Sequence, residues 1–293
     1  MGKQISQKLS TTEGLMKLED EFDFVLNIVS AAMIASGTVF LGMLDSLLAS
    51  MLLGFFLLLG CTLFNQYYDY AVDKVNKPNR PIPMGAITRS HVLKLAITSW
   101  LLTLILGAYL GLTQIIIVFV GIFIGLAYSH PKSRISSHRV LGLLLLTFGY
   151  VVLTFFIGWT LYADISLIPI WYLLLLFTTD LGAGMVKDYP DYEGDKKFGV
   201  KTLPVLIGYH RAIKLNAVLY CAPFLFLPTL YLFGYLNLGF ALIGTVFPLM
   251  GALVFMNLLR RSDKRTSQKA YWMMTLNIIL LRFVAVWAFI SFA

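Results

Sequence analysis

Long apolar runs alternate with short polar ones along nearly the whole chain of 293 residues. A helix that crosses a bilayer needs about 20 apolar residues, and runs of about that length recur without leaving room for a soluble domain. The pattern predicts an all-α fold with a single transmembrane domain over residues 1–293. Residues 1–23 of this domain are expected to form a polar N-terminal segment. The predicted spans are 24–44, 46–67, 93–111, 114–129, 140–160, 165–186, 214–234, 238–258 and 271–291.

Charge placement adds an orientation to this picture. A net charge of +8 is compatible with nucleic-acid binding, but all except one of the 23 lysines and arginines precede the first span or follow an even-numbered one. Loops rich in lysine and arginine stay in the cytoplasm. We therefore predict an integral multi-pass protein with a cytoplasmic N-terminus, an external C-terminus, membrane lipid as its surroundings and no nucleic-acid partner.

Two acidic segments end the second and sixth spans. Asn65, Asp69 and Asp73 are four residues apart, as are Asp191 and Asp195, so each set falls on one stripe of a helix. Carboxylates beside a membrane are costly unless a cation neutralises them, and Mg²⁺ is typically held by one or two carboxylates plus substrate phosphates. Acidic residues just outside a span are common, but the duplicated spacing favours Mg²⁺ and a diphosphate.

Basic and hydroxyl side chains accompany the acidic segments. Some of them follow the end of the fourth span, where hydroxyls and cations together form the kind of rim that binds phosphate. A solvated cytoplasmic charge is the alternative for each basic residue. The candidate substrate-binding residues are Arg80, Tyr128, Ser129, Lys132, Arg134, Lys187 and Lys201.

Three polar residues lie inside predicted spans. Asp180 and Arg282 carry opposite charges, and ionisable groups in a membrane usually find a partner, so we expect them to pair in a structural role. Asn27 either links two helices or faces a polar cavity and binds substrate.

The two halves of the sequence share a layout. In each half the second of four spans ends in an acidic segment and a basic loop. Spans one to four and five to eight therefore predict a diverged repeat, with a ninth helix added. Such a repeat would bring both acidic segments to one central cavity.

At these residues the chain resembles the UbiA superfamily of intramembrane prenyltransferases. The superfamily carries Asn-x-x-x-Asp-x-x-x-Asp after its second helix and Asp-x-x-x-Asp after its sixth. Asn65, Asp69 and Asp73 match the first pattern, Asp191 and Asp195 the second, and Asp188 an additional acidic position. The stretches 76–83, 128–129 and 193–204 are also similar, most of all to the digeranylgeranylglyceryl phosphate synthase and homogentisate prenyltransferase branches.

The resemblance implies nine helices around a cavity, two Mg²⁺ ions and a prenyl diphosphate donor, with Asp69 and Asp191 central to catalysis. It also places Tyr128, Ser129, Lys132 and Arg134 near the diphosphate. The implied reaction is transfer of the prenyl group, through an allylic cation, to a lipophilic acceptor from the bilayer. Many members carry Arg-Pro before the asparagine of the first helix, where this chain has Phe24-Val25-Leu26 before Asn27, so the acceptor stays open.

Two other functions remain as alternatives. The superfamily also contains terpene cyclases, which act on a prenyl diphosphate without an acceptor. A transporter with repeats and broken helices is a further possibility, but its charges are expected near the middle of the membrane. Here the acidic segments lie at the ends of spans, which favours chemistry on a soluble headgroup.

Overall fold

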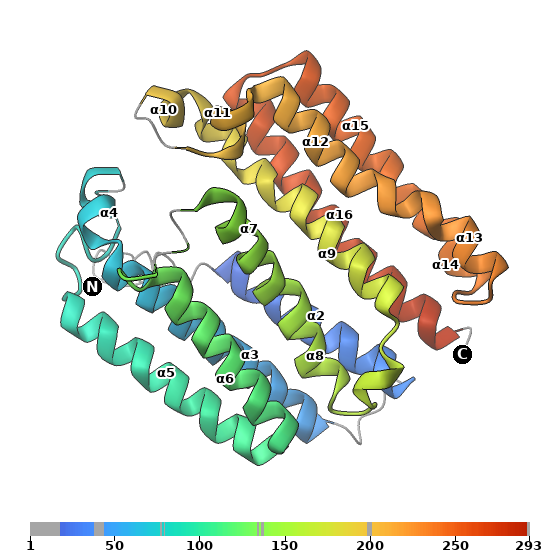
Figure 1. Cartoon of the computed structure of the whole chain (residues 1–293), viewed down its shortest axis with the longest axis horizontal. Helices are drawn as coiled ribbons and strands as arrows, with labels where there is room; N and C mark the ends of the chain where they lie inside the picture. The colour runs from blue at the N-terminus through green and yellow to red at the C-terminus, as the bar shows by residue number, and fades with distance from the viewer. Residues whose placement is uncertain are drawn as a thin grey trace, which may run out of the picture. The chain divides into compact units, whose positions relative to one another are not determined.

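The protein is helical throughout the part of the chain that the computed structural model describes, residues 18–37, 44–76, 78, 80–133, 135, 138–197 and 201–291. Figure 1 shows the elements in order. In the first part of the chain they are α2 (Leu18–Ser36), α3 (Leu44–Tyr68), α4 (Tyr70–Asn76), α5 (Arg89–Leu110), α6 (Leu112–Ser129), α7 (Arg139–Thr147), the π-helical η3 (Phe148–Leu153) and α8 (Thr154–Trp159).

The second part begins with a short 3-10 turn after α8. Its elements are η4 (Ile165–Leu167), α9 (Ile170–Gly184), the 3-10 helix η5 (Met185–Asp191), α10 (Tyr192–Lys197), α11 (Leu203–Ile207), α12 (Tyr209–Cys221), η6 (Ala222–Phe226), α13 (Leu227–Leu232), α14 (Leu238–Gly244), α15 (Val246–Arg260) and α16 (Lys264–Ser291).

The helices form two compact units. One comprises Met1–Ala32, Phe40–His138 and Leu153–Ala163, and the other comprises Met33–Val39, Arg139–Val152 and Asp164–Ala293. Each unit contains one acidic segment.

In the first unit α3 packs along both α5 and α6. Small residues permit this close approach: a Cβ added at Gly60 would collide with the Trp100 ring, and one at Gly121 would lie 2.9 Å from Leu57 Cδ2. Leu53 of α3 and Val118 of α6 are fully buried. The packing fixes the ends of α3 and α6, where the first candidate site lies.

In the second unit α12 packs against α9 and α15, and α16 packs against α15, α9 and η5. A Cβ added at Gly182 of α9 would lie 2.8 Å from the Asn216 carbonyl oxygen and 2.8 Å from the Tyr220 amide nitrogen, both on α12. Because these are backbone atoms that cannot swing away, glycine is what allows the two helices to touch. This contact sets α12 beside the end of α9, where the second acidic segment begins.

Eight helical segments of the described chain are long and apolar enough to cross a membrane. They are Leu44–Tyr68, Arg89–Leu110, Leu112–Ser129, Val140–Trp159, Ile170–Lys197, Tyr209–Leu232, Leu238–Arg260 and Lys264–Ser291. The apolar part of the first predicted span, Phe22–Ser36, is shorter, so the count of nine is not confirmed.

The first predicted span differs from the structure at both ends. The apolar pattern predicts 24–44, but α2 begins at Leu18 and ends at Ser36, where Gly37 follows with a φ of 63°. Glycine adopts this left-handed conformation without a steric cost and commonly ends helices. The apolar pattern continues beyond Ser36 and does not reveal the end of the helix, so the predicted span is too long at this end.

Candidate functional site

The first acidic segment forms one continuous helical stripe. The Asp69 amide donates to the Asn65 carbonyl at 2.9 Å, and the Asp73 amide donates to the Asp69 carbonyl at 2.8 Å. Asp69 itself sits in a turn between α3 and α4, but these two bonds keep the four-residue spacing of a helix. The predicted alignment of Asn65, Asp69 and Asp73 on one face is therefore confirmed.

Arg80 returns from the following loop to this stripe. Its Nη1 lies 2.6 Å from Asp73 Oδ2, and the Asp73 residue is only 6% exposed. A buried carboxylate needs a cation or several donors close by. The ion pair places a fixed positive charge, on a residue predicted to bind substrate, beside the stripe.

A second arginine, which is not among the predicted site residues, contacts the same segment. Arg89, the first residue of α5, donates from Nη2 to the Tyr67 carbonyl at 3.0 Å. Its guanidinium also lies 4.7 Å from the Tyr67 ring centroid and 5.0 Å from that of Tyr70. Arg89 thus links the last turn of α3 to the first turn of α4 across Asp69, through cation–π contacts that no spacing rule reveals.

The end of α6 lies beside the end of α3. The rings of Tyr68 and His130 are 5.5 Å apart, edge to face. Ser129 is buried, with no hydrogen-bond partner for its hydroxyl among the described residues, and Lys132 is exposed. The structure therefore brings the predicted hydroxyl and basic rim next to the first acidic segment. Tyr128 is half-buried there, and Arg134 lies outside the described residues.

The second acidic segment is not one regular α-helix. Residues 185–191 form the 3-10 helix η5, and the helix α10, which contains Asp195, begins directly after it at Tyr192. The shared stripe of Asp191 and Asp195 stays a prediction. In a 3-10 helix residues three apart eclipse one another. Asp188 and Asp191 therefore share one face of η5. Pro190 lies inside η5 and cannot donate a backbone hydrogen bond, which disfavours a regular α-helix here.

Buried polar contacts hold η5 from its other side. The Tyr189 hydroxyl accepts from Asn216 Nδ2 at 2.8 Å, and both residues are buried. The Tyr189 ring lies 5.1 Å from that of Tyr209, whose hydroxyl is 3.0 Å from Ser267 Oγ. This network is not predictable from the sequence, because nothing in the local pattern pairs a tyrosine with an asparagine 27 residues away.

The predicted lysines of the second segment are on the surface. Lys187 and Lys201 are exposed, as is Asp191, whereas Asp188 and Asp195 are half-buried. The roles assigned to these residues stay predictions, since no bound molecule shows what they contact.

The donor atoms fit a hard cation that shares its coordination with a ligand. Among the described residues no three His, Cys, Asp or Glu side chains cluster closely enough to enclose a metal ion. Mg²⁺ does not require such a cage, because it usually takes one or two carboxylates and completes its shell with water and phosphate oxygens. Asn65, Asp69 and Asp73, spaced four residues apart along one helical stripe, carry oxygen donors of the kind that Mg²⁺ takes.

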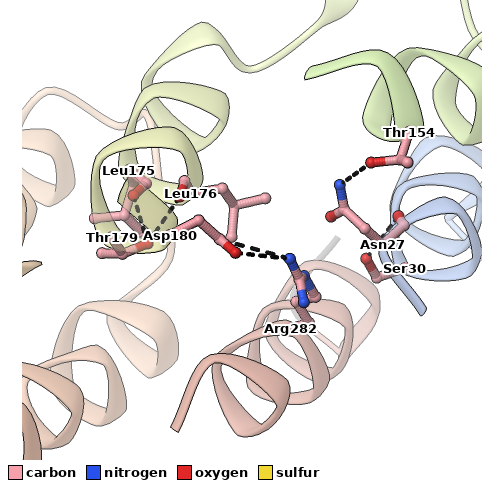
Figure 2. A network of polar contacts seen from close by, with 8 residues as sticks. All are labelled: Asn27, Ser30, Thr154, Leu175, Leu176, Thr179, Asp180 and Arg282. Atoms are coloured by element: carbon pink, nitrogen blue, oxygen red, sulfur yellow. Dashed lines mark hydrogen bonds and ion pairs between the residues drawn. The ribbon is translucent and has the colours of Figure 1, made fainter. Parts of the chain in front are cut away.

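Asn27 has a protein partner. It is fully buried in α2, and its Nδ2 donates to Thr154 Oγ1 of α8 at 2.6 Å, as Figure 2 shows. A Cβ added at Gly158 would collide with the Ile28 carbonyl oxygen, so α2 and α8 touch closely at this point. The hydrogen bond agrees with the alternative that Asn27 links two helices. Binding of substrate by Asn27 stays a prediction.

The expected pair between Asp180 and Arg282 is confirmed. Arg282 Nη2 of α16 lies 3.3 Å from Asp180 Oδ1 of α9, and Arg282 is fully buried (Figure 2). Thr179, which precedes Asp180 in α9, donates from its hydroxyl to the carbonyls of Leu175 and Leu176 in the same helix. Within the second unit the pair cross-links α9 to α16, as expected of charges inside a membrane bundle.

Eight helices of membrane-crossing length in the described residues define a polytopic membrane protein, and each of its two units carries an acidic segment at a helix end. The sequence pattern of the UbiA prenyltransferase family matches residues 24–279 of this chain. The chain therefore belongs to the UbiA prenyltransferase family. The predictions of family, prenyltransferase activity and a multi-pass membrane fold are confirmed.

The chain is similar to two digeranylgeranylglyceryl phosphate synthases. The chain is 27% identical over 230 residues to the digeranylgeranylglyceryl phosphate synthase of Methanosphaera stadtmanae, covering 78% of this chain and 80% of that protein. It is also 27% identical over 282 residues to the same enzyme of Methanococcus aeolicus, covering 92% and 98%.

Solved structures share the fold. A structure of digeranylgeranylglyceryl phosphate synthase matches with a TM-score of 0.75 at 20% identity, covering 97% of this chain and 99% of the other. A UbiA homolog from Archaeoglobus fulgidus, bound to DMAPP and Mg²⁺, matches with a TM-score of 0.72 at 19% identity, covering 97% and 100%.

Proposed function

We propose that this protein is a Mg²⁺-dependent prenyltransferase that moves a prenyl group from a prenyl diphosphate to a lipophilic acceptor. The observation that carries the proposal is the stripe of Asn65, Asp69 and Asp73 with Arg80 bound to its buried end. Oxygen donors and a guanidinium side by side suit a metal–diphosphate headgroup, since the oxygens take the cation and the guanidinium takes phosphate oxygens.

The metal set we propose is Asn65, Asp69, Asp73, Asp188, Asp191 and Asp195, with two Mg²⁺ ions serving one diphosphate. Asp69 and Asp191 are the central members of the two segments. When bound, Mg²⁺ neutralises the charge that accumulates on the leaving diphosphate. The family match runs from 24 to 279, through both compact units, which supports treating the chain as one catalytic domain.

The chain's own residues supply the rest of the chemistry. Arg80, Lys132, Arg134, Lys187 and Lys201 bind and orient the diphosphate, together with the hydroxyls of Tyr128 and Ser129. The allylic C–O bond breaks with its electron pair leaving on the diphosphate oxygen, and fixed cations lower the cost of that charge. The remaining allylic cation is shielded from water by apolar and aromatic side chains, whose ring faces attract cations.

For the acceptor we propose an isoprenoid glyceryl phosphate, because two relatives that match most of this chain are digeranylgeranylglyceryl phosphate synthases. The acceptor hydroxyl oxygen forms the new C–O bond and loses its proton, so the products are an ether and free diphosphate. Asn27 is the candidate for contacting the polar end of the acceptor, beside its bond to Thr154.

Mass spectrometry of the products tests this function. Purified protein is given geranylgeranyl diphosphate with and without geranylgeranylglyceryl phosphate, and shorter diphosphates serve as comparison donors. We expect the diether phosphate only when donor, acceptor and Mg²⁺ are all present. Efficient conversion of the donor alone to a cyclic hydrocarbon or alcohol, unaffected by any acceptor, would establish the cyclase alternative instead.

We also propose that both acidic segments face the cytoplasm, because the basic residues gather in the loops on their side. A single cysteine at position 79, in a variant without Cys61 and Cys221, tests this orientation. We expect an impermeant thiol reagent to label it only after cells are opened, and labelling of intact cells contradicts the orientation.

A further inference from the structure

The 3-10 helix η5 needs support from outside itself. Runs of 3-10 helix longer than three or four residues are uncommon because their hydrogen bonds have poor geometry. Here the run covers seven residues and includes Pro190, which removes one more backbone donor. Something other than the local backbone must therefore hold this conformation.

The support comes from one row of η5. Val186 and Tyr189 are three residues apart, so they share a face of the 3-10 helix, and both are buried. Asp188 and Asp191 form another row, which is half-buried to exposed. The rotation of η5 about its axis therefore decides where both aspartates point.

Tyr189 has the contacts that fix this rotation. Its hydroxyl is bonded at 2.8 Å to Asn216, a fully buried residue of α12, and its ring lies against Tyr209. Tyr209 in turn is tied to Ser267 of α16 at 3.0 Å. A hydrogen bond between two buried groups is directional, and losing one partner leaves the other unsatisfied.

We infer that Tyr189 is a positioning residue: its hydroxyl bond to Asn216 sets the rotation of η5 and so holds Asp188 and Asp191 on one face. The expected effect on catalysis rests on the proposed function, whereas the expected effect on η5 does not. The hydrogen bond and its effect on η5 can be measured without any substrate.

The chain offers a matched control for the test. Tyr189→Phe removes only the hydroxyl and keeps the ring against Tyr209. Tyr220→Phe makes the same change at another buried tyrosine of the second unit, whose hydroxyl has no partner among the described residues. Asn216→Leu removes the other half of the bond.

Hydrogen–deuterium exchange of the purified protein without ligands gives the first readout. We expect Tyr189→Phe and Asn216→Leu each to speed exchange of the amides of residues 185–197, and the double variant to match the single ones. Tyr220→Phe should exchange there as the wild type does. Unchanged exchange in Tyr189→Phe overturns the inference, whatever the protein catalyses.

Kinetics with geranylgeranyl diphosphate and Mg²⁺ give the second readout. We expect Tyr189→Phe and Asn216→Leu to lower kcat about tenfold or more, as misplaced catalytic groups do, and to raise the Mg²⁺ concentration for half-maximal rate. The KM for the acceptor should stay unchanged. A loss in Tyr189→Phe with full activity in Asn216→Leu would mean that the hydroxyl contacts the substrate directly, which overturns a positioning role. A wild-type protein inactive in this assay would count against the proposed function alone.

Discussion

Arg80 and Asp73 form a short ion pair, 2.6 Å from Nη1 to Oδ2, at the buried end of the first acidic stripe. The two side chains are 22% and 9% exposed, so water screens the pair only in part. The two residues are seven positions apart in the sequence. The pair fixes the position of the Asp73 carboxylate.

Removing Arg80 should therefore impair catalysis. Arg80→Ala leaves the Asp73 carboxylate without its guanidinium and takes a cation away from the diphosphate. We expect kcat/KM to fall about 10- to 100-fold, or about 1.4 to 2.7 kcal/mol of transition-state stabilisation. Arg80→Lys should recover part of the loss, because a lysine keeps the charge and loses the planar fork. Arg211→Ala, at an exposed arginine of α12, controls for the loss of one positive charge, and equal activity of the two alanine variants would exclude this role.

Asn27 and Thr154 allow a linking role to be separated from a role in acceptor binding. Their side chains share one hydrogen bond of 2.6 Å between α2 and α8. Loss of a buried hydrogen bond costs about 1–3 kcal/mol, so Asn27→Ala and Thr154→Val should lower thermal stability by similar amounts. We expect only Asn27→Ala to reduce transfer to the acceptor more than release of diphosphate from the donor. If Thr154→Val shifts that ratio equally, Asn27 acts by linking the helices.

The pair of Asp180 and Arg282 should contribute to stability rather than to chemistry. Arg282 is fully buried, and removing one member of a buried pair costs about 3–5 kcal/mol because the other charge is left uncompensated. Asp180→Leu should therefore lower the melting temperature strongly. The double variant Asp180→Leu with Arg282→Met should regain much of it, with near-normal kcat in the folded protein. A stable double variant without activity would show that the pair takes part in catalysis.

Asp263 should make the start of α16 sensitive to acid. Hydrogen bonds from the side chain and then the backbone of Thr266 lower the pKa of the Asp263 carboxyl below its usual value. Such a group stabilises the fold above the pKa of the unfolded chain, about 3.9, and the contribution is lost as the pH falls through the folded-state pKa. The melting temperature of Asp263→Ala should lie below that of the wild type at pH 7, and the two should converge in strong acid. A gap that persists at the lowest pH would show that the charge contributes nothing.

The sequence predicted the first acidic segment well because all its information is local. Apolar residues mark α3, and the four-residue spacing marks the stripe. Arg89 was missed because its contacts are with two tyrosine rings and a backbone carbonyl, which leave no spacing in the sequence.

The second acidic segment was predicted less well for a related reason. Spacing arguments assume one helix type, and the change from α9 to the 3-10 helix η5 places Asp188 in line with Asp191. That change depends on Pro190 and on a buried bond from Tyr189 to a residue 27 positions away. The residue types of the segment were predictable, and its geometry required the tertiary structure.

Release of diphosphate by the purified protein tests the central claim most directly. Wild type, Asp69→Asn and Asp191→Asn are compared with geranylgeranyl diphosphate and acceptor, with Mg²⁺ and with EDTA, after equal melting temperatures establish that each variant is folded. We expect release by the wild type only with Mg²⁺, and a loss of at least about 100-fold in each variant, since each removes charge stabilisation of the leaving group. Full turnover in EDTA, or normal release by either variant, would contradict the account.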